Sequence, residues 1–325
     1  MRSLVCAAGL AIASMAPASA VATESPARVP RIGMLMLEPR SPGDLAETVT
    51  RALNALGYRD GTAAFDVRSA AWSHARLREL ASELAASKVD VIVALTNVPG
   101  FAAKEATKTV PIVVLGTHAA VETGLVDSLA RPGGNITGVE NLAPELDSKR
   151  LQLLREIAPR VKRLGVIFNS SDPGAAIHLR AVTDAARSLQ LDIVSLPVSQ
   201  PADFDKTLDG AGALSLDSVM TFTDRLTALN WSKVDAFSKK HRLPTVCEFR
   251  FLAQAGCLVS YGPSVAEFTG RVAAQVDRIL KGAKPGEVPM DRVTRFELVV
   301  NQQTAKAIGV SVPQVIRTLA DDVID

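Results

Sequence analysis

The stretch Ser128-Leu-Ala-Arg-Pro-Gly-Gly-Asn-Ile-Thr-Gly-Val139 lies between two runs of alternating strand and helix patterns. Its centre holds four adjacent residues that favour turns: Pro132, Gly133, Gly134 and Asn135. Proline fixes φ, glycine takes positive φ without steric cost, and asparagine tolerates the left-handed region. The stretch is therefore either an ordinary surface turn or a hinge between two lobes, and the patterns on either side bear on which it is.

Before this stretch, the chain alternates between buried strands and amphipathic helices. Continuous apolar runs, typical of strands buried on both faces of a parallel sheet, occupy residues 31–37, 89–95 and 111–115. Residues 64–68 predict a further strand. Helices with capping residues fill the intervals, as after Asp44. This order and the short connections predict a doubly wound α/β unit with a parallel sheet.

After the stretch, the alternation starts again and predicts a second lobe of the same class. Its strands are expected at residues 163–168, 191–196, 213–222, 243–247 and 257–261. The remaining tail is too short for a third domain, so we expect it to complete both lobes by crossing between them. The predicted lobe 1 comprises residues 31–137 with about 263–291, and the predicted lobe 2 comprises residues 138–262 with about 292–325.

The charge balance excludes one class of partner. The 325 residues carry a formal net charge of +2 at pH 7, and lysine and arginine form no dense run. A nucleic-acid-binding surface needs such a basic patch, so we expect no nucleic acid partner. The expected partner is a small molecule or another protein.

Residues 1–20 have the pattern of a secretory signal peptide. Arg2 precedes an apolar run over residues 4–15, and the small residues Ala18-Ser19-Ala20 follow. The run is shorter than the roughly 20 residues that cross a bilayer, so the segment predicts export to the periplasm and not a membrane anchor. Residues 21–30 lack periodicity and are expected to form a flexible leader.

Two cysteines remain after the signal segment, which contains Cys6, is removed. Cys247 and Cys257 are an even number of thiols in what would be an oxidising compartment. They either form a disulfide, which requires Cα atoms within roughly 7 Å, or remain two buried thiols that act as small hydrophobes. Their spacing is not Cys-x-x-Cys, so we expect no redox role.

Sequence motifs for catalysis are missing. The sequence has no Gly-x-x-x-x-Gly-Lys-Ser/Thr loop and no Gly-x-Ser-x-Gly elbow. The four histidines, His74, His118, His178 and His241, are far apart and have no second ligand at metal spacing. We therefore expect no enzyme, no cofactor and no metal site.

Polar residues follow the predicted strands. In open α/β sheets, ligands bind beyond the carboxyl ends of the strands, where helix N-termini offer free N–H groups and a partial positive charge. The candidates there are Glu38, Arg40, Ser41, Thr96, Asn97, Thr117 and His118 in the first lobe, and Asn169, Ser170, Ser171, Asp172, Thr221, Phe222, Thr223, Glu248 and Tyr261 in the second. Any one of them can instead simply cap the following helix. As a set that faces one cleft, they predict a binding site.

Several motifs resemble those of a known family. They are the stretch 128–138, Lys149-Arg-Leu-Gln-Leu-Leu154, Leu243-Pro-Thr245, Ser260-Tyr-Gly-Pro263, Ile279-Leu-Lys-Gly282 and Phe296-Glu-Leu-Val-Val-Asn301. In this order they resemble the substrate-binding proteins of a family of bacterial ABC importers that includes tryptophan-binding members and has the type I periplasmic-binding-protein fold. The resemblance covers nearly all of residues 31–325.

The resemblance implies two Rossmann-like lobes joined by three crossovers, with a ligand closed between them and no catalysis. It also implies a monomer that docks on a permease in the inner membrane with its cytoplasmic ATPase. The stretch quoted first would then be the first crossover and act as a hinge. The same fold also serves regulators, so an exported ligand sensor that acts on a membrane receptor is the alternative.

The expected ligand is a small organic molecule that bears a carboxylate and is amino-acid-like or aromatic. Helix N-termini would hold its anion, Arg40 would add charge, and Tyr261 or Phe222 would pack against the apolar part. Two loops depart from the family pattern. His118-Ala119 stands where relatives often have Asp-Pro, and Thr96-Asn97-Val98 replaces a small, glycine-containing loop. A relative's ligand therefore does not transfer directly to this chain.

Overall fold

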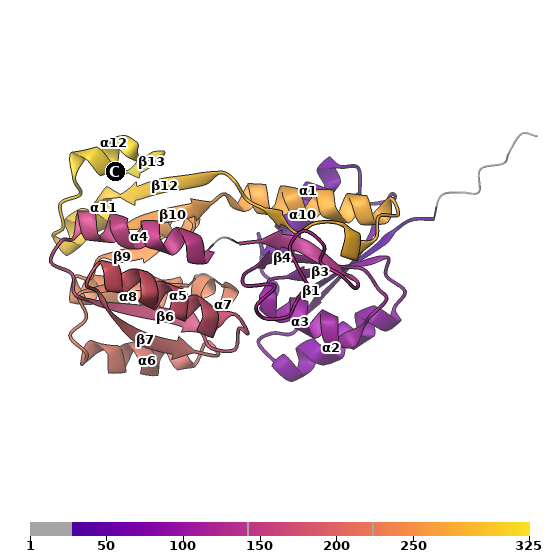
Figure 1. The fold of residues 1–325 in the computed structure, drawn as a ribbon, viewed down its shortest axis with the longest axis horizontal. Helices are drawn as coiled ribbons and strands as arrows, with labels where there is room; N and C mark the ends of the chain where they lie inside the picture. Colours follow the sequence, from indigo (N-terminus) through magenta and orange to yellow (C-terminus); the bar gives the residue numbers. More distant parts are fainter. Residues whose placement is uncertain (1–27, 142, 223) are drawn as a thin grey trace, which may run out of the picture.

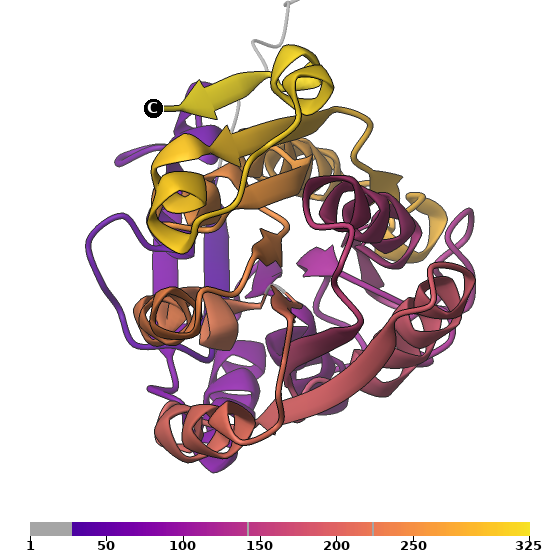
Figure 2. The ribbon, with the colours of Figure 1, turned by 90° about the vertical axis from the view of Figure 1, so that its left-hand side faces the viewer.

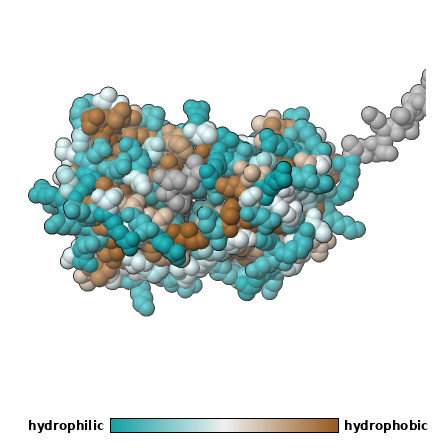
Figure 3. Space-filling view, in the orientation of Figure 1, coloured by the Kyte–Doolittle hydropathy of each residue, from teal (hydrophilic) through white to brown (hydrophobic). Residues whose placement is uncertain are grey.

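The computed structural model describes residues 28–141, 143–222 and 224–325. Two α/β lobes lie side by side (Figure 1), and each is built around its own mainly parallel sheet. The predicted fold class is therefore confirmed, while the expected signal peptide at residues 1–20 lies outside the described residues. Within these ranges no helix is long and apolar enough to cross a membrane. Hydrophilic residues are spread over the face shown in Figure 3.

Lobe 1 contains a six-stranded sheet in the order β11-β5-β4-β3-β1-β2. Its elements are β1 (Arg31–Met36), α1 (Leu45–Ala55), β2 (Ala64–Ser69), α2 (His74–Ala86), β3 (Val91–Leu95), α3 (Asn97–Ala106), β4 (Ile112–Thr117), β5 (Ile136–Glu140), α10 (Val265–Leu280), the 3-10 helix η1 (Pro285–Glu287) and β11 (Asp291–Arg292). All neighbouring strands are parallel. Their carboxyl ends therefore lie along one edge of the sheet.

Helices cover both faces of this sheet, which explains the continuous apolar strands. Met34 of β1 packs with residues of α1 and α10, whereas the next residue, Leu35, packs with residues of α2 and α3. Successive side chains of a strand point to opposite faces, so a strand between two helical layers must be apolar throughout.

Lobe 2 contains a seven-stranded sheet in the order β13-β12-β10-β9-β8-β6-β7. Its elements are α4 (Ala143–Ile157), β6 (Arg163–Asn169), α5 (Ala175–Ser188), β7 (Asp192–Val198), α6 (Asp203–Gly212), β8 (Ser218–Thr221), α7 (Arg225–Leu229), α8 (Trp231–His241), β9 (Thr245–Cys247), α9 (Arg250–Gln254), β10 (Val259–Pro263), β12 (Phe296–Asn301), α11 (Gln302–Ile308), α12 (Gln314–Leu319) and β13 (Asp322–Ile324). Only β12 runs antiparallel to its neighbour β10. Figure 2 looks at this lobe end-on and shows the yellow C-terminal elements at one edge of the sheet.

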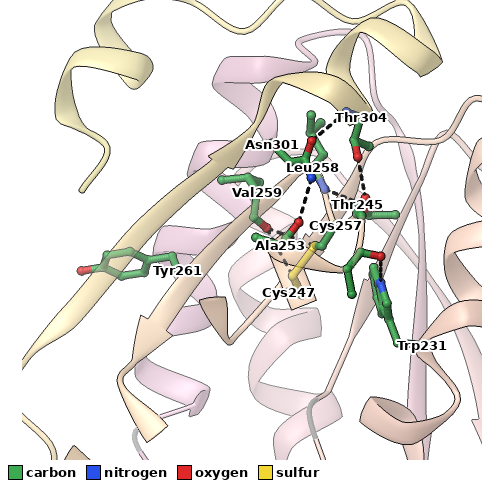
Figure 4. Close-up of a disulfide and its surroundings, with 12 residues drawn as sticks. Trp231, Thr245, Cys247, Ala253, Cys257, Leu258, Val259, Tyr261, Asn301 and Thr304 are labelled. Carbon is green, nitrogen blue, oxygen red and sulfur yellow. Dashed lines mark hydrogen bonds between the residues drawn. A yellow bond between two sulfur atoms is a disulfide. The ribbon is translucent and has the colours of Figure 1, made fainter. Parts of the chain in front are cut away.

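A disulfide joins Cys247, the last residue of β9, to Cys257, which lies just before β10. Cys247 and Cys257 are fully buried, and their Cα atoms are 6.6 Å apart (Figure 4). Hydrogen bonds anchor the segment between them, because the Trp231 indole donates to the Ala255 carbonyl (3.0 Å) and the Asn301 amide donates to the Ala253 carbonyl (2.8 Å). Of the two alternatives open from the sequence, the structure contains the bridge. Residues 248–256 are thus held at both ends.

The chain passes between the sheets at three points of its described course. These are Asn141 between β5 and α4, Ser264 between β10 and α10, and residues 293–295 between β11 and β12. The sequence-based boundary at 137/138 falls inside β5, which pairs with β4 along its length and belongs wholly to lobe 1. Likewise, Arg292 pairs with Glu140 of β5 and belongs to lobe 1.

The predicted hinge is corrected by this geometry. Pro132, Gly133, Gly134 and Asn135 form a turn before β5, at the end of the strand away from the crossover. The Gly133 N–H donates to the carbonyl of Gly286, and the Asn135 amide donates to the carbonyl of Val110 (2.7 Å). Both partners belong to lobe 1, so this stretch is a turn within that lobe and not a crossover. The positive φ values of Gly133 (+73°) and Gly134 (+55°) explain why glycine occupies both positions.

Candidate ligand-binding site

A cavity of about 270 Å³ lies between the lobes, at the carboxyl ends of their strands. Lobe 1 and the crossovers line it with Gly43, Leu45, Thr48, Thr96, Leu115, Gly116, Asn141, Val265 and Phe268, and lobe 2 lines it with Asp224, Arg225, Ala228, Phe249 and Phe251. Because both lobes contribute, the cavity is complete only when the lobes are together.

Most of the cavity wall is apolar and partly aromatic. Phe249 is the N-cap residue of α9 and Phe251 lies in the first turn of this helix, and their rings stack at 5.6 Å with an interplanar angle of 13°. Phe268 of α10 meets the Phe249 ring edge-on at 6.2 Å. Leu45 and Leu115 add aliphatic surface from lobe 1. Such a wall suits a flat, apolar body, since aromatic rings favour offset-stacked and edge-on partners.

Thr96 is the N-cap residue of α3 and lines the cavity in a strained conformation. Its φ is +101°, which is rare for a β-branched residue, and its side chain makes no capping hydrogen bond. Residues in such regions typically store about 1–3 kcal/mol and are retained at functional sites. The strain agrees with a role for this loop in the cleft.

Arg225 connects the two lobes through an ion pair. Its Nε donates to Glu38 Oε1 at 2.7 Å, from α7 of lobe 2 to the loop after β1 in lobe 1. Glu38 is fully buried, and its Oε2 has no hydrogen-bond partner among the described residues. Burial raises the pKa of the Glu38 carboxyl, although Arg225 acts in the opposite direction.

A second, much smaller pocket of about 20 Å³ shares Asn141 and Asp224 with the larger cavity. Its other lining residues are His118, Phe168, Asn169, Asp172, Ala175, His178, Phe222 and Glu248. The Asn141 side chain is 6% exposed, and its Oδ1 has no hydrogen-bond partner among the described residues. A buried amide oxygen without a donor is unfavourable, so this pocket suits a group that can donate to it.

Direct hydrogen bonds join the lobes around the small pocket. The Asn97 amide donates to Asp172 Oδ1 (2.7 Å) and accepts from the Thr117 hydroxyl (2.7 Å). At the first crossover, the Asn141 amide donates to Glu248 Oε1 (2.5 Å). His118 Nε2 lies 3.5 Å from Asp172 Oδ1. The contacts of Asn97 and His118 with Asp172 join residues of different lobes, so the lobes are closed on one another here.

Asp224 links the small pocket to the start of α7. One carboxylate oxygen accepts from the Thr227 N–H (2.8 Å) as a helix cap, and the other accepts from the Asn169 amide (2.5 Å). Burial raises the pKa of Asp224 to about 6, and the charge of Asp172 adds to the rise, while the hydrogen bonds from Thr227 and Asn169 oppose it. The pKa of Asp224 thus lies well above that of an ordinary aspartate.

A buried ionic cluster supports the lobe 2 side of the pocket. Arg150 donates to Asp147 Oδ1 (2.6 Å) and to the carbonyl of Tyr261 (2.7 Å), and His178 bonds to the other oxygen of Asp147. Burial favours the neutral form of Asp147, but His178 and Arg150 outweigh it and hold its pKa below the usual range. Burial raises the pKa of Glu248 despite the nearby Arg150.

The structure brings together most of the residues proposed from the sequence. Glu38, Thr96, Asn97, Thr117, His118, Asn169, Asp172, Phe222 and Glu248 line one of the two spaces or bond to residues that do. These residues follow different strands. They lie close together because the carboxyl ends of the strands of both sheets face the space between the lobes.

Other proposed residues do not reach the site. Arg40 is half-exposed and bonds to Asp44, and the Ser170 hydroxyl donates to the carbonyl of Val198. Ser41, Ser171, Thr221 and Tyr261 line neither space. The Tyr261 ring instead lies 6.1 Å from Phe296 in lobe 2. Thr223 lies outside the described residues.

Sequence patterns alone missed the aromatic wall and the charged pair at α7. Phe249 and Phe251 follow shortly after Glu248, which was itself proposed because it stands at a strand end. Asp224 and Arg225 follow β8 in the same way and would have been found by extending the rule for strand ends by two residues. Leu45, Leu115 and Phe268 carry no such signal, since apolar residues of helices and strands normally belong to the core.

Two parallel-sheet lobes that enclose a cavity at the carboxyl ends of their strands define a type I periplasmic-binding-protein fold. A profile of the ABC transporter substrate binding proteins matches residues 36–324. The chain therefore belongs to this family, as its motifs predicted, and the family consists of non-catalytic binding proteins.

Individual relatives differ in what they bind. The tyrosine-binding protein of Clostridioides difficile (strain R20291) is 26% identical over 259 residues, which are 79% of this chain and 74% of that protein. The ABC domain in complex with L-Trp from Streptococcus pneumonia superposes with a TM-score of 0.85 at 21% identity, over 91% of this chain and 99% of that one. A ligand-free, open substrate-binding protein with adhesive properties from Clostridium difficile superposes with a TM-score of 0.64 at 23% identity. The match covers 91% of this chain and 99% of that one. At these identities the two solved structures establish the fold alone.

Proposed function

We propose that this chain is an exported protein that captures an aromatic, amino-acid-like ligand between its lobes and delivers it to an ABC permease. The observation that carries the proposal is the 270 Å³ cavity, which has an aromatic wall and is lined from both lobes. Relatives that bind tyrosine and L-Trp support the same class of ligand. The signal-peptide pattern of residues 1–20 supports export.

The ligand's carboxylate would face Arg225. This arginine lines the cavity, is about one-fifth exposed, and uses its Nε for Glu38. Its Nη1 and Nη2 form no hydrogen bond with the described residues. A guanidinium with free donors is well suited to bind a carboxylate. Arg225 therefore takes the role that the sequence suggested for Arg40.

Ligand binding can be tested by thermal unfolding with a panel of amino acids, aromatic acids and small peptides. A ligand at 100 times its Kd stabilises a protein by about 2.7 kcal/mol. X-ray scattering on the same samples would detect lobe closure. No stabilisation across the panel, together with an unchanged scattering curve, would refute the proposed ligand class.

Substitution at adjacent positions of α7 provides a matched control. Ala228 lines the cavity, whereas Leu229 is 45% exposed. We expect Ala228→Trp to fill the cavity and weaken binding at least tenfold, because overpacking typically costs about 1–3 kcal/mol. Leu229→Trp should bind like the unmodified chain. Equal affinities of the two variants would show that the ligand does not occupy this cavity.

A further inference from the structure

The second and third crossovers run side by side between the lobes (Figure 1). Pro263 of β10 pairs with Phe296 of β12 in lobe 2. Directly beyond this pair, one segment continues through Ser264 into α10 of lobe 1, and residues 293–295 form the other connection to that lobe. A rotation of the lobes against each other must be absorbed in such connections. Contacts between the two segments can therefore set how readily the lobes open.

The carboxylate of Glu267 joins these two crossovers. Glu267 lies in the first turn of α10, and its oxygens accept from the N–H groups of Thr294 (3.1 Å) and Arg295 (3.2 Å) in the third crossover. Arg271, one turn further along α10, donates to Glu267 Oε1 at 2.7 Å and to the Thr294 hydroxyl at 3.3 Å. Burial acts to raise the pKa of Glu267, but the hydrogen bonds from Arg271 and the two N–H groups outweigh it and lower the pKa. The carboxylate is therefore held in its charged form against the crossover.

The sequence around Glu267 encodes a different set of partners for it. Ser264-Val-Ala-Glu267 has the Ser-x-x-Glu pattern of a capping box, in which the serine hydroxyl accepts from the glutamate N–H and the carboxylate accepts from the serine N–H. Neither half of the box is formed here. Ser264 is the N-cap residue of α10, but its side chain makes no capping hydrogen bond, and the Glu267 oxygens accept from the third crossover. At α7, by contrast, Asp224 and Thr227 form a complete box.

We propose that Glu267 is a closed-state latch, which exchanges its bonds to the N–H groups of Thr294 and Arg295 for the capping box with Ser264 when the lobes open. In the closed state the carboxylate satisfies two N–H groups of the third crossover. In the open state it would satisfy an N–H group at the start of α10 instead, and the Ser264 hydroxyl would satisfy another. This inference goes beyond the proposed function, since neither Glu267 nor Ser264 lines the larger cavity.

Two substitutions should change ligand affinity in opposite directions. Glu267→Gln can still complete a capping box, but one oxygen becomes an NH2 group that cannot accept from the crossover. We expect affinity to fall about tenfold, because the closed state is populated less and apparent affinity follows its population. Ser264→Ala removes only the box, so we expect affinity to rise about three- to tenfold, as the open state loses its cap. A residue that merely stabilises the fold would not produce opposite signs.

Each substitution has a matched control in lobe 1. Glu287→Gln removes an exposed partner of Lys284 in η1. Ser73→Ala removes a formed cap, because the Ser73 hydroxyl accepts from the Arg76 N–H at the start of α2. Both controls should bind like the unmodified chain, although Ser73→Ala should lower the melting temperature.

Two measurements on the full chain decide the outcome. Calorimetric titration with L-tyrosine and L-tryptophan gives the affinities, and X-ray scattering without ligand shows how open each variant is. Glu267→Gln should be more open than the unmodified chain and Ser264→Ala more closed. Changes of the same sign, or no gain in closure or affinity in Ser264→Ala, would overturn the exchange. If neither amino acid binds, the proposed ligand class fails, whereas scattering of the free variants still decides whether Glu267 acts as the latch.

Discussion

Lobe 1 and lobe 2 contribute different chemistry to the space between them. Every described charged residue that lines the larger cavity, Asp224 and Arg225, comes from lobe 2, and so do the stacked Phe249 and Phe251. Lobe 1 contributes one aromatic ring, Phe268, and otherwise aliphatic and neutral polar side chains such as Leu115 and Thr96. The small pocket repeats this difference, since its described lining residues all come from lobe 2 apart from His118, which follows β4, and Asn141 at the first crossover. If the ligand binds here as proposed, lobe 2 would supply the charged groups that recognise it, and lobe 1 would complete the enclosure.

This difference suggests an order of events. A ligand can meet aromatic and charged groups on the open surface of lobe 2 before lobe 1 approaches. Closure then adds the lobe 1 wall and the hydrogen bonds from Asn97 to Asp172 and from Arg225 to Glu38. Two-lobed binding proteins commonly close in this way around hinges of a few residues.

The largest predicted effect is a loss of folding stability when the buried ionic cluster of lobe 2 is disrupted. Arg150 is 2% exposed and holds Asp147 and the Tyr261 carbonyl. We predict that Arg150→Met lowers the free energy of unfolding by about 3–5 kcal/mol, because it leaves buried carboxylates uncompensated. Urea unfolding measures the change. Arg187→Met, at an exposed pair with Asp184, should cost under about 1 kcal/mol. Similar losses in both variants would mean that the cluster does not stabilise the charged face of lobe 2.

A smaller effect is expected where the lobes touch. Gly174 of lobe 2 lies against His118 of lobe 1, and a Cβ atom there would be 2.7 Å from the imidazole and 3.2 Å from the His118 carbonyl oxygen. Gly174→Ala should therefore hinder closure and weaken ligand binding about ten- to hundredfold, since overpacking costs about 1–3 kcal/mol. Gly210→Ala in α6 has no atom within 4 Å and serves as the control. Unchanged affinity and closure in Gly174→Ala would show that this contact does not limit the closed state.

The smallest predicted effect concerns pH. Burial raises the pKa of Asp224, which lines the cavity, to about 6, so binding of an amino acid, whose ammonium this carboxylate would attract, should weaken about tenfold between pH 7.5 and pH 5 as the carboxylate is protonated. Burial also raises the pKa of the neighbouring Glu248, whose protonation would act in the same direction. Calorimetric titration of L-tyrosine at both pH values measures the change. Asp224→Asn should have a flatter pH profile, and a flat profile in the unmodified chain would show that the Asp224 charge does not contribute to ligand binding.

Protonation of Asp224 is expected to change the free energy of unfolding and the ligand affinity in opposite directions. Asp224 has a pKa near 4 in an unfolded chain and about 6 in the folded protein, so its protonation favours folding. Its contribution to the free energy of unfolding is therefore present below about pH 4 and is lost as the pH rises through 6. The free protein and the complex should consequently respond in opposite directions to this one group.

The fold followed from the sequence because its strands are continuous apolar runs between capped helices. This pattern fixes a parallel sheet with helices on both faces, as in β1, where Met34 and Leu35 face opposite layers. The position of the hinge could not be predicted from the sequence. Pro132–Asn135 has the local composition of a flexible joint, but whether a turn joins two lobes depends on strand pairing, which local composition does not encode.

Part of the candidate site could also be predicted from the sequence. Asn97, His118, Asn169 and Glu248 were found because they stand at strand ends, a position that sequence reveals. Arg225 and the aromatic wall were not, because their role depends on which helix and loop face the cleft once the lobes meet. Arg40 was proposed because it lies in the loop after the first strand, but in the structure it bonds to Asp44 outside the cavity.

Asn141 has a mechanical consequence that follows from its place in the chain. It is the described residue at the first crossover, and it borders both spaces. Points near an axis of rotation move little when two bodies turn about it, whereas Thr96 and Leu115, which lie on lobe 1, travel with that lobe. A ligand bonded to the Asn141 amide would keep this contact while the lobe 1 wall swings away. Release would then occur in two stages, with the contacts to lobe 1 broken first and the attachment at the pivot last.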